Sequence, residues 1–155
     1  MEIMLVEIAE RLEAMQRAIE GAIEGLPDEA LDWQPGPGMN SLGVLVTHTI
    51  GAQRFWIGDV AGGDDSGRDR EAEFKANGVN ATELIERSRA VLTHSRSVLG
   101  GLSPVDLSVV RAVVTSGRRV TTTWAILHAL EHTALHTGHI EITRQLWDAA
   151  CDAER

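Results

Sequence analysis

The feature that most constrains the fold is a row of histidines spaced four residues apart. His128, His132 and His136 follow this spacing in the segment TWAILHALEHTALHTGHIEITRQLW, and His139 comes three residues later. Residues three or four apart lie on one face of an α-helix, so these imidazoles act together only if the segment is helical. Another histidine, His48, lies in a separate apolar segment with helical spacing, SLGVLVTHTIGAQRFWI.

Four long segments have the apolar spacing of amphipathic helices, and no internal repeat relates them. We predict that the first runs from about residue 3 to 23 and that the linker WQPGPG separates it from the second. Capping side chains place the start of the second helix at Asn40 or Ser41 and that of the third at Asn80 or Thr82. The predicted ends of the second, third and fourth helices are near residues 60, 99 and 150.

The connection before the last helix has a different pattern. β-branched residues flank Thr115, Ser116 and Gly117, which predicts a short hairpin or an extended loop over residues 109–121. Four amphipathic helices in 155 residues are typical of a single domain. We therefore predict an all-α chain in which residues 1–155 form one antiparallel four-helix bundle.

The charge balance narrows the class of partner. The chain has 23 acidic and 14 basic residues, a net charge of -9, whereas nucleic acids and anionic membranes attract basic surfaces. No apolar run approaches the roughly 18 residues of a membrane span, and no basic and apolar leader follows Met1. Cys151 is the only cysteine, so no intrachain disulfide can form. We expect a cytoplasmic protein that acts on a small molecule, without nucleic-acid or membrane partners.

The histidine row shares its sector of the helix with Ala125, Leu135 and Leu146, at about 100° per residue. This composition predicts that the row faces the bundle core. His48 shares its own helix face with other apolar residues, among them Val44. Imidazoles from two helices are therefore expected to face each other, and the interior of a helical bundle is where such proteins place their metal sites.

Several imidazoles in one region admit more than one explanation. Each buried nitrogen left unpaired costs about 1–3 kcal/mol, and a divalent metal satisfies three nitrogens at once. The alternatives are a hydrogen-bonded structural cluster and a pH-sensing cluster. A HExxH peptidase is disfavoured because Thr133 follows His132 where that motif needs glutamate. A di-iron bundle is disfavoured because the chain lacks two Glu-x-x-His repeats.

Two stretches resemble the DinB/YfiT-like superfamily. LDWQPGPGMNSLGVLVTHTIGAQRFW is similar to its tryptophan–proline linker and the helix with the first histidine ligand, and EHTALHTGHIEITRQLW is similar to its last-helix signature. The resemblance implies that His48, His132 and His136 bind a metal, and that His128 and His139 support the site without binding it. His128 lies one turn before His132, however, so the ligand set could shift by one turn. Thr137 and His139 also depart from the arginine and glutamine of many relatives.

The resemblance also implies an activity. Characterised branches of the superfamily include transferases and isomerases that use a low-molecular-weight thiol, such as mycothiol or bacillithiol, and many members are dimers. We therefore expect a homodimeric metalloenzyme with Zn²⁺ or Ni²⁺, and with thiol-dependent S-transfer as its reaction. The alternatives are a metal-dependent hydrolase and a non-catalytic metal-binding or stress-response dimer.

A basic cluster precedes the histidine row along the chain. Arg111, Arg118 and Arg119 lie in the predicted hairpin, close to Trp124 at the start of the last helix. Most such clusters are solvated surface, but this position would let a guanidinium group reach an acidic substrate over the metal.

Overall fold

The structure is a computed structural model that describes residues 3–153. Within that range the regular secondary structure is helical apart from one two-stranded sheet, which confirms the predicted all-α chain with a short hairpin before its last helix. None of the described helices has the length and apolar content to cross a bilayer. In chain order the elements are α1 (Ile3–Ile23), α2 (Asp28–Asp32), α3 (Leu42–Gln53), the π-helix η1 (Arg54–Gly62), α4 (Arg70–Glu73), α5 (Ala81–Gly101), the 3-10 helix η2 (Asp106–Ser108), β1 (Val110–Ala112), β2 (Arg119–Thr121) and α6 (Thr122–Ala153).

Three of the long helices begin at a side chain that caps them. Ser41 accepts a hydrogen bond of 3.2 Å from the backbone N–H three residues later, and Asn80 accepts one of 2.9 Å in the same way. Thr121 caps α6 through a bond of 3.1 Å to the N–H of Trp124. These bonds satisfy N–H groups that the first turn of a helix leaves unpaired. Of the predicted cap alternatives, the structure selects Ser41 and Asn80.

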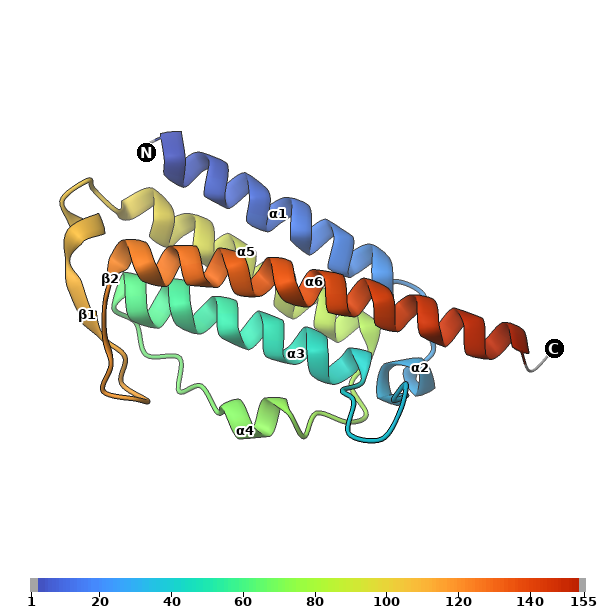
Figure 1. Cartoon of the computed structure of the whole chain (residues 1–155). Helices are drawn as coiled ribbons and strands as arrows, with labels where there is room; N and C mark the ends of the chain where they lie inside the picture. Colours follow the sequence, from blue (N-terminus) through green and yellow to red (C-terminus); the bar gives the residue numbers. More distant parts are fainter. Residues whose placement is uncertain (1–2, 154–155) are drawn as a thin grey trace.

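The four long helical segments, α1, α3 with η1, α5 and α6, pack along one another (Figure 1). α1 and α6 run in one direction, and α3 and α5 run in the other, so these two packed pairs are parallel. This differs from the antiparallel bundle that we predicted. The reason is the connection over residues 63–80, here called the strap, which crosses back along α3 before α5 begins and carries α4.

α3 continues directly into η1, where the wider π-helical turns are of a kind that often accompanies functional sites. Glycine lets α5 approach this segment closely. A Cβ at Gly62 would lie 3.0 Å from Cγ1 of Val98. The segment ends at Gly63, whose φ of 82° is a left-handed conformation that favours glycine.

The face of α6 that enters the core is not the face of the histidine row. Its buried residues are Ala125, Ile126, Ala129, Thr133, Thr137, Ile140 and Thr143. Leu135 and Leu146, predicted to be buried beside the row, are 57% and 41% exposed. Ala125, the third residue predicted beside the row, is buried. The row therefore borders the core instead of facing it as predicted, and His132 and His136 are half-buried at its edge. A threonine such as Thr137 can enter the core because its hydroxyl donates to a carbonyl of the preceding turn, at 2.8 Å.

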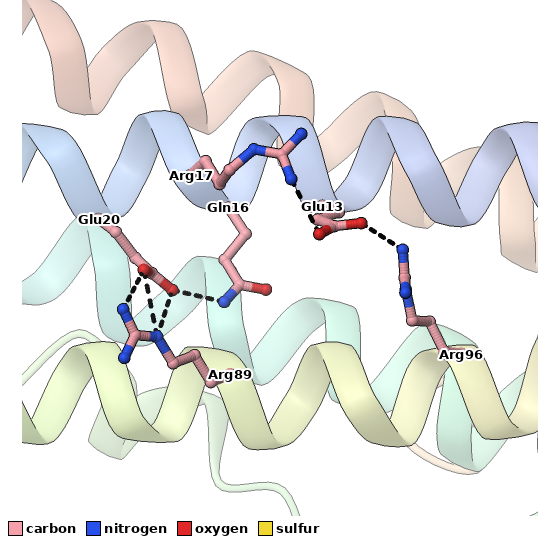
Figure 2. A network of polar contacts seen from close by, with 6 residues as sticks. All are labelled: Glu13, Gln16, Arg17, Glu20, Arg89 and Arg96. Carbon is pink, nitrogen blue, oxygen red and sulfur yellow. Dashed lines mark hydrogen bonds and ion pairs between the residues drawn. The ribbon is translucent and has the colours of Figure 1, made fainter.

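A polar seam joins α1 to α5 (Figure 2). At one end Arg89 donates to both carboxylate oxygens of Glu20, with the shortest contact at 2.7 Å. At the other end the carboxylate of Glu13 lies between two guanidinium groups. We call this the α1/α5 seam, and its members are Glu13, Gln16, Arg17, Glu20, Arg89 and Arg96.

Candidate functional site

Three imidazoles converge between α3 and α6. His48 comes from α3, and His132 and His136 come from successive turns of α6. One ring nitrogen from each lies within 4.8 Å of the other two, a grouping that could hold a metal ion. The Nε2 atoms of His48 and His132 are 3.1 Å apart. The structure thus brings together the three residues that the resemblance implied, which we call the triad; metal binding by them remains a prediction.

The triad fits a divalent cation. Two nitrogens bound to Zn²⁺ at about 2.1 Å with tetrahedral geometry lie about 3.4 Å apart, close to the spacing of His48 and His132. Without a cation, these two Nε2 atoms satisfy each other only if one is protonated and the other is not. Nδ1 of His132 is buried and has no hydrogen-bond partner among residues 3–153. The cluster therefore contains a buried nitrogen whose hydrogen-bonding capacity is not satisfied by the described part of the chain.

The electrostatics of the triad favour neutral imidazoles. Burial, followed by repulsion from His136, His48 and His128, lowers the pKa of His132 to about 3. Burial and the neighbouring His48 and His139 lower the pKa of His136 to about 4. Both rings are therefore neutral near pH 7, and the neutral imidazole is the form that binds a metal.

Glu73 of α4 is the site residue that the sequence analysis missed. Its Oε2 accepts a hydrogen bond of 2.9 Å from Nδ1 of His48. Arg68 donates Nε to Oε1 at 2.7 Å and Nη2 to Oε2 at 2.8 Å. Burial raises the pKa of the Glu73 carboxyl, but the bonds from Arg68 and His48 outweigh burial and lower that pKa overall. An ionised carboxylate can only accept, so it places the His48 proton on Nδ1 and leaves Nε2 free to face the other imidazoles.

Gly51 makes room for this carboxylate. It lies one turn after His48 on α3, and a Cβ there would be 2.0 Å from Oε1 of Glu73. A larger residue at this position would displace Glu73 from His48. Gly51, within an apolar helical segment, is a signal in the sequence that something approaches α3 closely at this position, because glycine is unfavourable in a helix interior.

The remaining two histidines of the row have different surroundings. Nδ1 of His139 is 3.4 Å from Nδ1 of His136, so His139 contacts the triad directly. The His128 ring lies 6.0 Å from that of His132 and stacks on Trp124 at 4.7 Å, with Trp56 edge-on at 4.7 Å. His128 is thus part of an aromatic wall beside the triad. The supporting role of both residues remains a prediction.

Two aromatic side chains covered by guanidinium groups flank the triad. The Arg118 guanidinium lies 4.2 Å from the Trp124 ring centroid. The Phe74 ring packs 4.5 Å from that of His48, and Arg70 lies 4.8 Å from the Phe74 ring. Within residues 3–153, no ion pair to a carboxylate occupies either guanidinium group. Both remain able to bind an anionic group of a substrate.

Comparison with known proteins relates the chain to a protein family and to solved structures. A family model described as mycothiol-S-transferase matches residues 7–149. The crystal structure of a conserved protein from Enterococcus faecalis superposes with a TM-score of 0.77 at 18% identity, over 96% of this chain and 99% of that one. A DinB-like protein from Bacillus cereus ATCC 10987 gives 0.71 at 17% identity, over 89% of each chain. No curated protein matches significantly.

Proposed function

The chain belongs to the mycothiol-S-transferase family, within the DinB/YfiT-like superfamily, and from this premise we propose that it is a metal-dependent thiol transferase. The observation that carries the proposal is the convergence of His48, His132 and His136 within 4.8 Å. Three neutral ligands leave a divalent cation, Zn²⁺ or Ni²⁺, with its full charge and an open position, where it would favour the thiolate form of a bound thiol.

In the proposed reaction the side chains around the triad hold and orient the reactants. Glu73 keeps Nε2 of His48 directed at the other two imidazoles. The wall of Trp56, Trp124 and His128 offers an apolar surface for a small electrophile, and Arg118 offers a positive charge. The thiolate sulfur would attack an electrophilic carbon and form a C–S bond, while the leaving group departs with the electrons of its own bond.

The experiment uses tag-free protein reconstituted with Co²⁺, whose absorption reports on its ligands. Mycothiol, bacillithiol, glutathione and cysteine are added in turn, followed by iodoacetamide as the electrophile. We expect sulfur-to-metal charge transfer with one thiol and metal-dependent formation of its thioether. If no thiol changes the spectrum and none is consumed, the transferase proposal is wrong. Hydrolysis of p-nitrophenyl acetate by the same protein would then favour the metal-dependent hydrolase, and its absence the non-catalytic binder.

We also propose that the four packed helices are the family's four-helix bundle and that two copies associate through α6. The support is a strip of large apolar side chains, each 41–57% exposed, which lie within about 100° of the helix circumference: Leu127, Leu135, Ile142 and Leu146. Light scattering should give twice the chain mass of 16.8 kDa. A Leu135→Asp/Ile142→Asp variant should be monomeric, and a monomeric wild type would contradict the proposal.

A further inference from the structure

A cavity of about 740 Å³ lies between α3, α5 and the strap, apart from the triad. None of the three triad histidines lines it, but Glu73, which binds His48, forms part of its wall. Sites for small molecules typically enclose roughly 300–1,000 Å³. The cavity is thus large enough for a ligand of its own, and the proposed transferase reaction does not use it.

Most of the cavity wall is apolar and built from small side chains. Where the strap crosses α3 and α5 it leaves space between them, and it contributes the small residues Gly67, Ala72 and Ala76 to the cavity wall. The apolar residues of the wall are Ile50, Ala72, Ala76, Val79, Ala90 and Val91. Such a wall favours a ligand with an apolar body, since burying that body removes apolar surface from water.

Two of the three guanidinium groups at the cavity are already committed. Arg68 makes its two hydrogen bonds to Glu73. Arg54 pairs with Asp59 at 2.9 Å and with Asp64 at 3.3 Å. These charges are satisfied within the protein, so neither is expected to attract a ligand strongly.

The third guanidinium group is only loosely paired. The closest carboxylate to Arg87 is that of Glu83, at 4.0 Å, and the Arg87 side chain is 43% exposed. The acidic residue Asp69 also lines the cavity, but it caps α4 by accepting from the backbone N–H of Ala72 at 3.0 Å. Thr47 lines the cavity too, and its buried hydroxyl has no hydrogen-bond partner in the described part of the chain. The polar groups left for a ligand are thus one loosely paired guanidinium group and one hydroxyl.

We propose that this cavity binds a small monocarboxylate with an apolar body, with its carboxylate at Arg87 and its body against the wall of α5 and the strap. A carboxylate forms charge-assisted hydrogen bonds with a guanidinium group, and the apolar lining accommodates the rest. The chain's net charge of -9 disfavours general binding of anions, so saturable binding of a carboxylate would indicate a specific site.

The test is a calorimetric titration of metal-free protein with hexanoate, compared with hexanol and hexylammonium. We expect saturable binding of one hexanoate per chain and weaker binding of both analogues. Arg87→Gln should weaken hexanoate binding about 10–100-fold, because a hydrogen bond to a charged group is lost. Ala90→Leu, at an exposed position of α5, should weaken it by filling the cavity. Thermal melts of both variants would show that they fold.

Two controls locate the binding. Arg17→Gln removes a guanidinium group of α1 outside the cavity and should leave hexanoate binding unchanged. His132→Ala/His136→Ala removes two members of the triad and should also leave it unchanged, so the result is independent of the transferase proposal. Absence of saturable binding, equal binding of hexanol, or an unchanged affinity in Arg87→Gln would overturn the proposal. Loss of binding in the His132→Ala/His136→Ala variant would overturn it as well, by placing hexanoate at the triad.

Discussion

Two polar clusters join helices of this protein. One pairs groups of opposite charge, and the other brings together groups of the same kind. In the α1/α5 seam, carboxylates face guanidinium groups, as Glu20 faces Arg89 (Figure 2). In the triad, between α3 and α6, chemically identical imidazoles face one another, with His48 Nε2 3.1 Å from His132 Nε2. The charges of the seam are paired with opposite charges of the same chain. The imidazoles of the triad, in contrast, repel one another when they are protonated.

The electrostatic consequences differ in the same way. In the seam, burial raises the pKa of Glu20, but hydrogen bonds from Arg89 and Gln16 lower it overall, so its charged form is stabilised. In the triad, burial and mutual repulsion lower the pKa of His132 to about 3, so its charged form is destabilised. A cluster that stabilises its own charges supports the fold, whereas one that keeps several ligands neutral is suited to receive an external cation.

The largest difference between the clusters should appear in metal content. We expect tag-free wild type to bind about one equivalent of Zn²⁺ after reconstitution and dialysis, and the His48→Ala/His136→Ala variant to bind none, because one imidazole is left. Elemental analysis measures both. The matched control in the seam, Glu13→Ala/Glu20→Ala, should keep the full equivalent. Retention of Zn²⁺ by the histidine variant with wild-type affinity would rule out these ligands.

A smaller effect on Zn²⁺ binding should follow from Glu73→Gln, which keeps the size of the side chain but removes its charge. We expect the stoichiometry to remain at about one Zn²⁺, with an affinity about 10–100-fold lower, because the proton on His48 Nδ1 is held less firmly. Competition with a chromophoric chelator measures this affinity. Glu20→Gln is the control with the same change of chemistry. Equal affinities for both variants and wild type would show that Glu73 has no influence on the site.

The sequence predicted the triad and missed its carboxylate for a physical reason. His132 and His136 are one helical turn apart, so their proximity follows from local geometry, and helix caps such as Ser41 are local as well. Glu73 lies 25 residues after His48 in the strap, whose path depends on tertiary packing rather than on any periodic pattern. The spacing of residues in the sequence does not predict a contact that an irregular segment makes. For the contact between Glu73 and His48, only Gly51 indicated that α3 is approached closely.

The face of the histidine row was mispredicted for a related reason. Hydrophobicity placed Leu135 in the core, but the structure leaves it 57% exposed and buries Thr137. A helical threonine can satisfy its hydroxyl within its own helix, so polarity alone does not exclude it from a core. The consequence for function is favourable, because a row at the edge of the core remains accessible to a substrate.

Acid should destabilise the metal-free protein through the triad. His132 and His136 have folded-state pKa values of about 3 and 4, below the value near 6.5 of an unfolded histidine. Between about pH 6.5 and 4 the unfolded state binds more protons, so stability falls as the pH falls through this range. We expect urea unfolding at pH 6.5 and 5 to show this loss in wild type and a smaller loss in His132→Ala.

Measurements above pH 5 separate the effect of the histidines on stability from the effect of the carboxylates. The lowered pKa values of Glu73 and Glu20 affect stability only as the pH falls below the value near 4.3 of an unfolded glutamate. Glu20→Gln should therefore lose the same stability as wild type between pH 6.5 and 5. An equally steep loss in His132→Ala would contradict the assignment of the acid sensitivity to the triad.

The smallest effect should come from breaking the seam itself. Arg89 is largely exposed, so its pairing with Glu20 competes with water and is screened by salt. We expect Arg89→Gln to lower the melting temperature by no more than about 3 °C in low salt. The difference from wild type should disappear in 1 M NaCl, and Zn²⁺ affinity should stay unchanged. A larger loss that persists in high salt would mean that the seam stabilises the packing of α1 on α5 by more than charge. A change in Zn²⁺ affinity would mean that the two clusters are coupled through the helices between them, and the contrast between a structural seam and a functional triad would then fail.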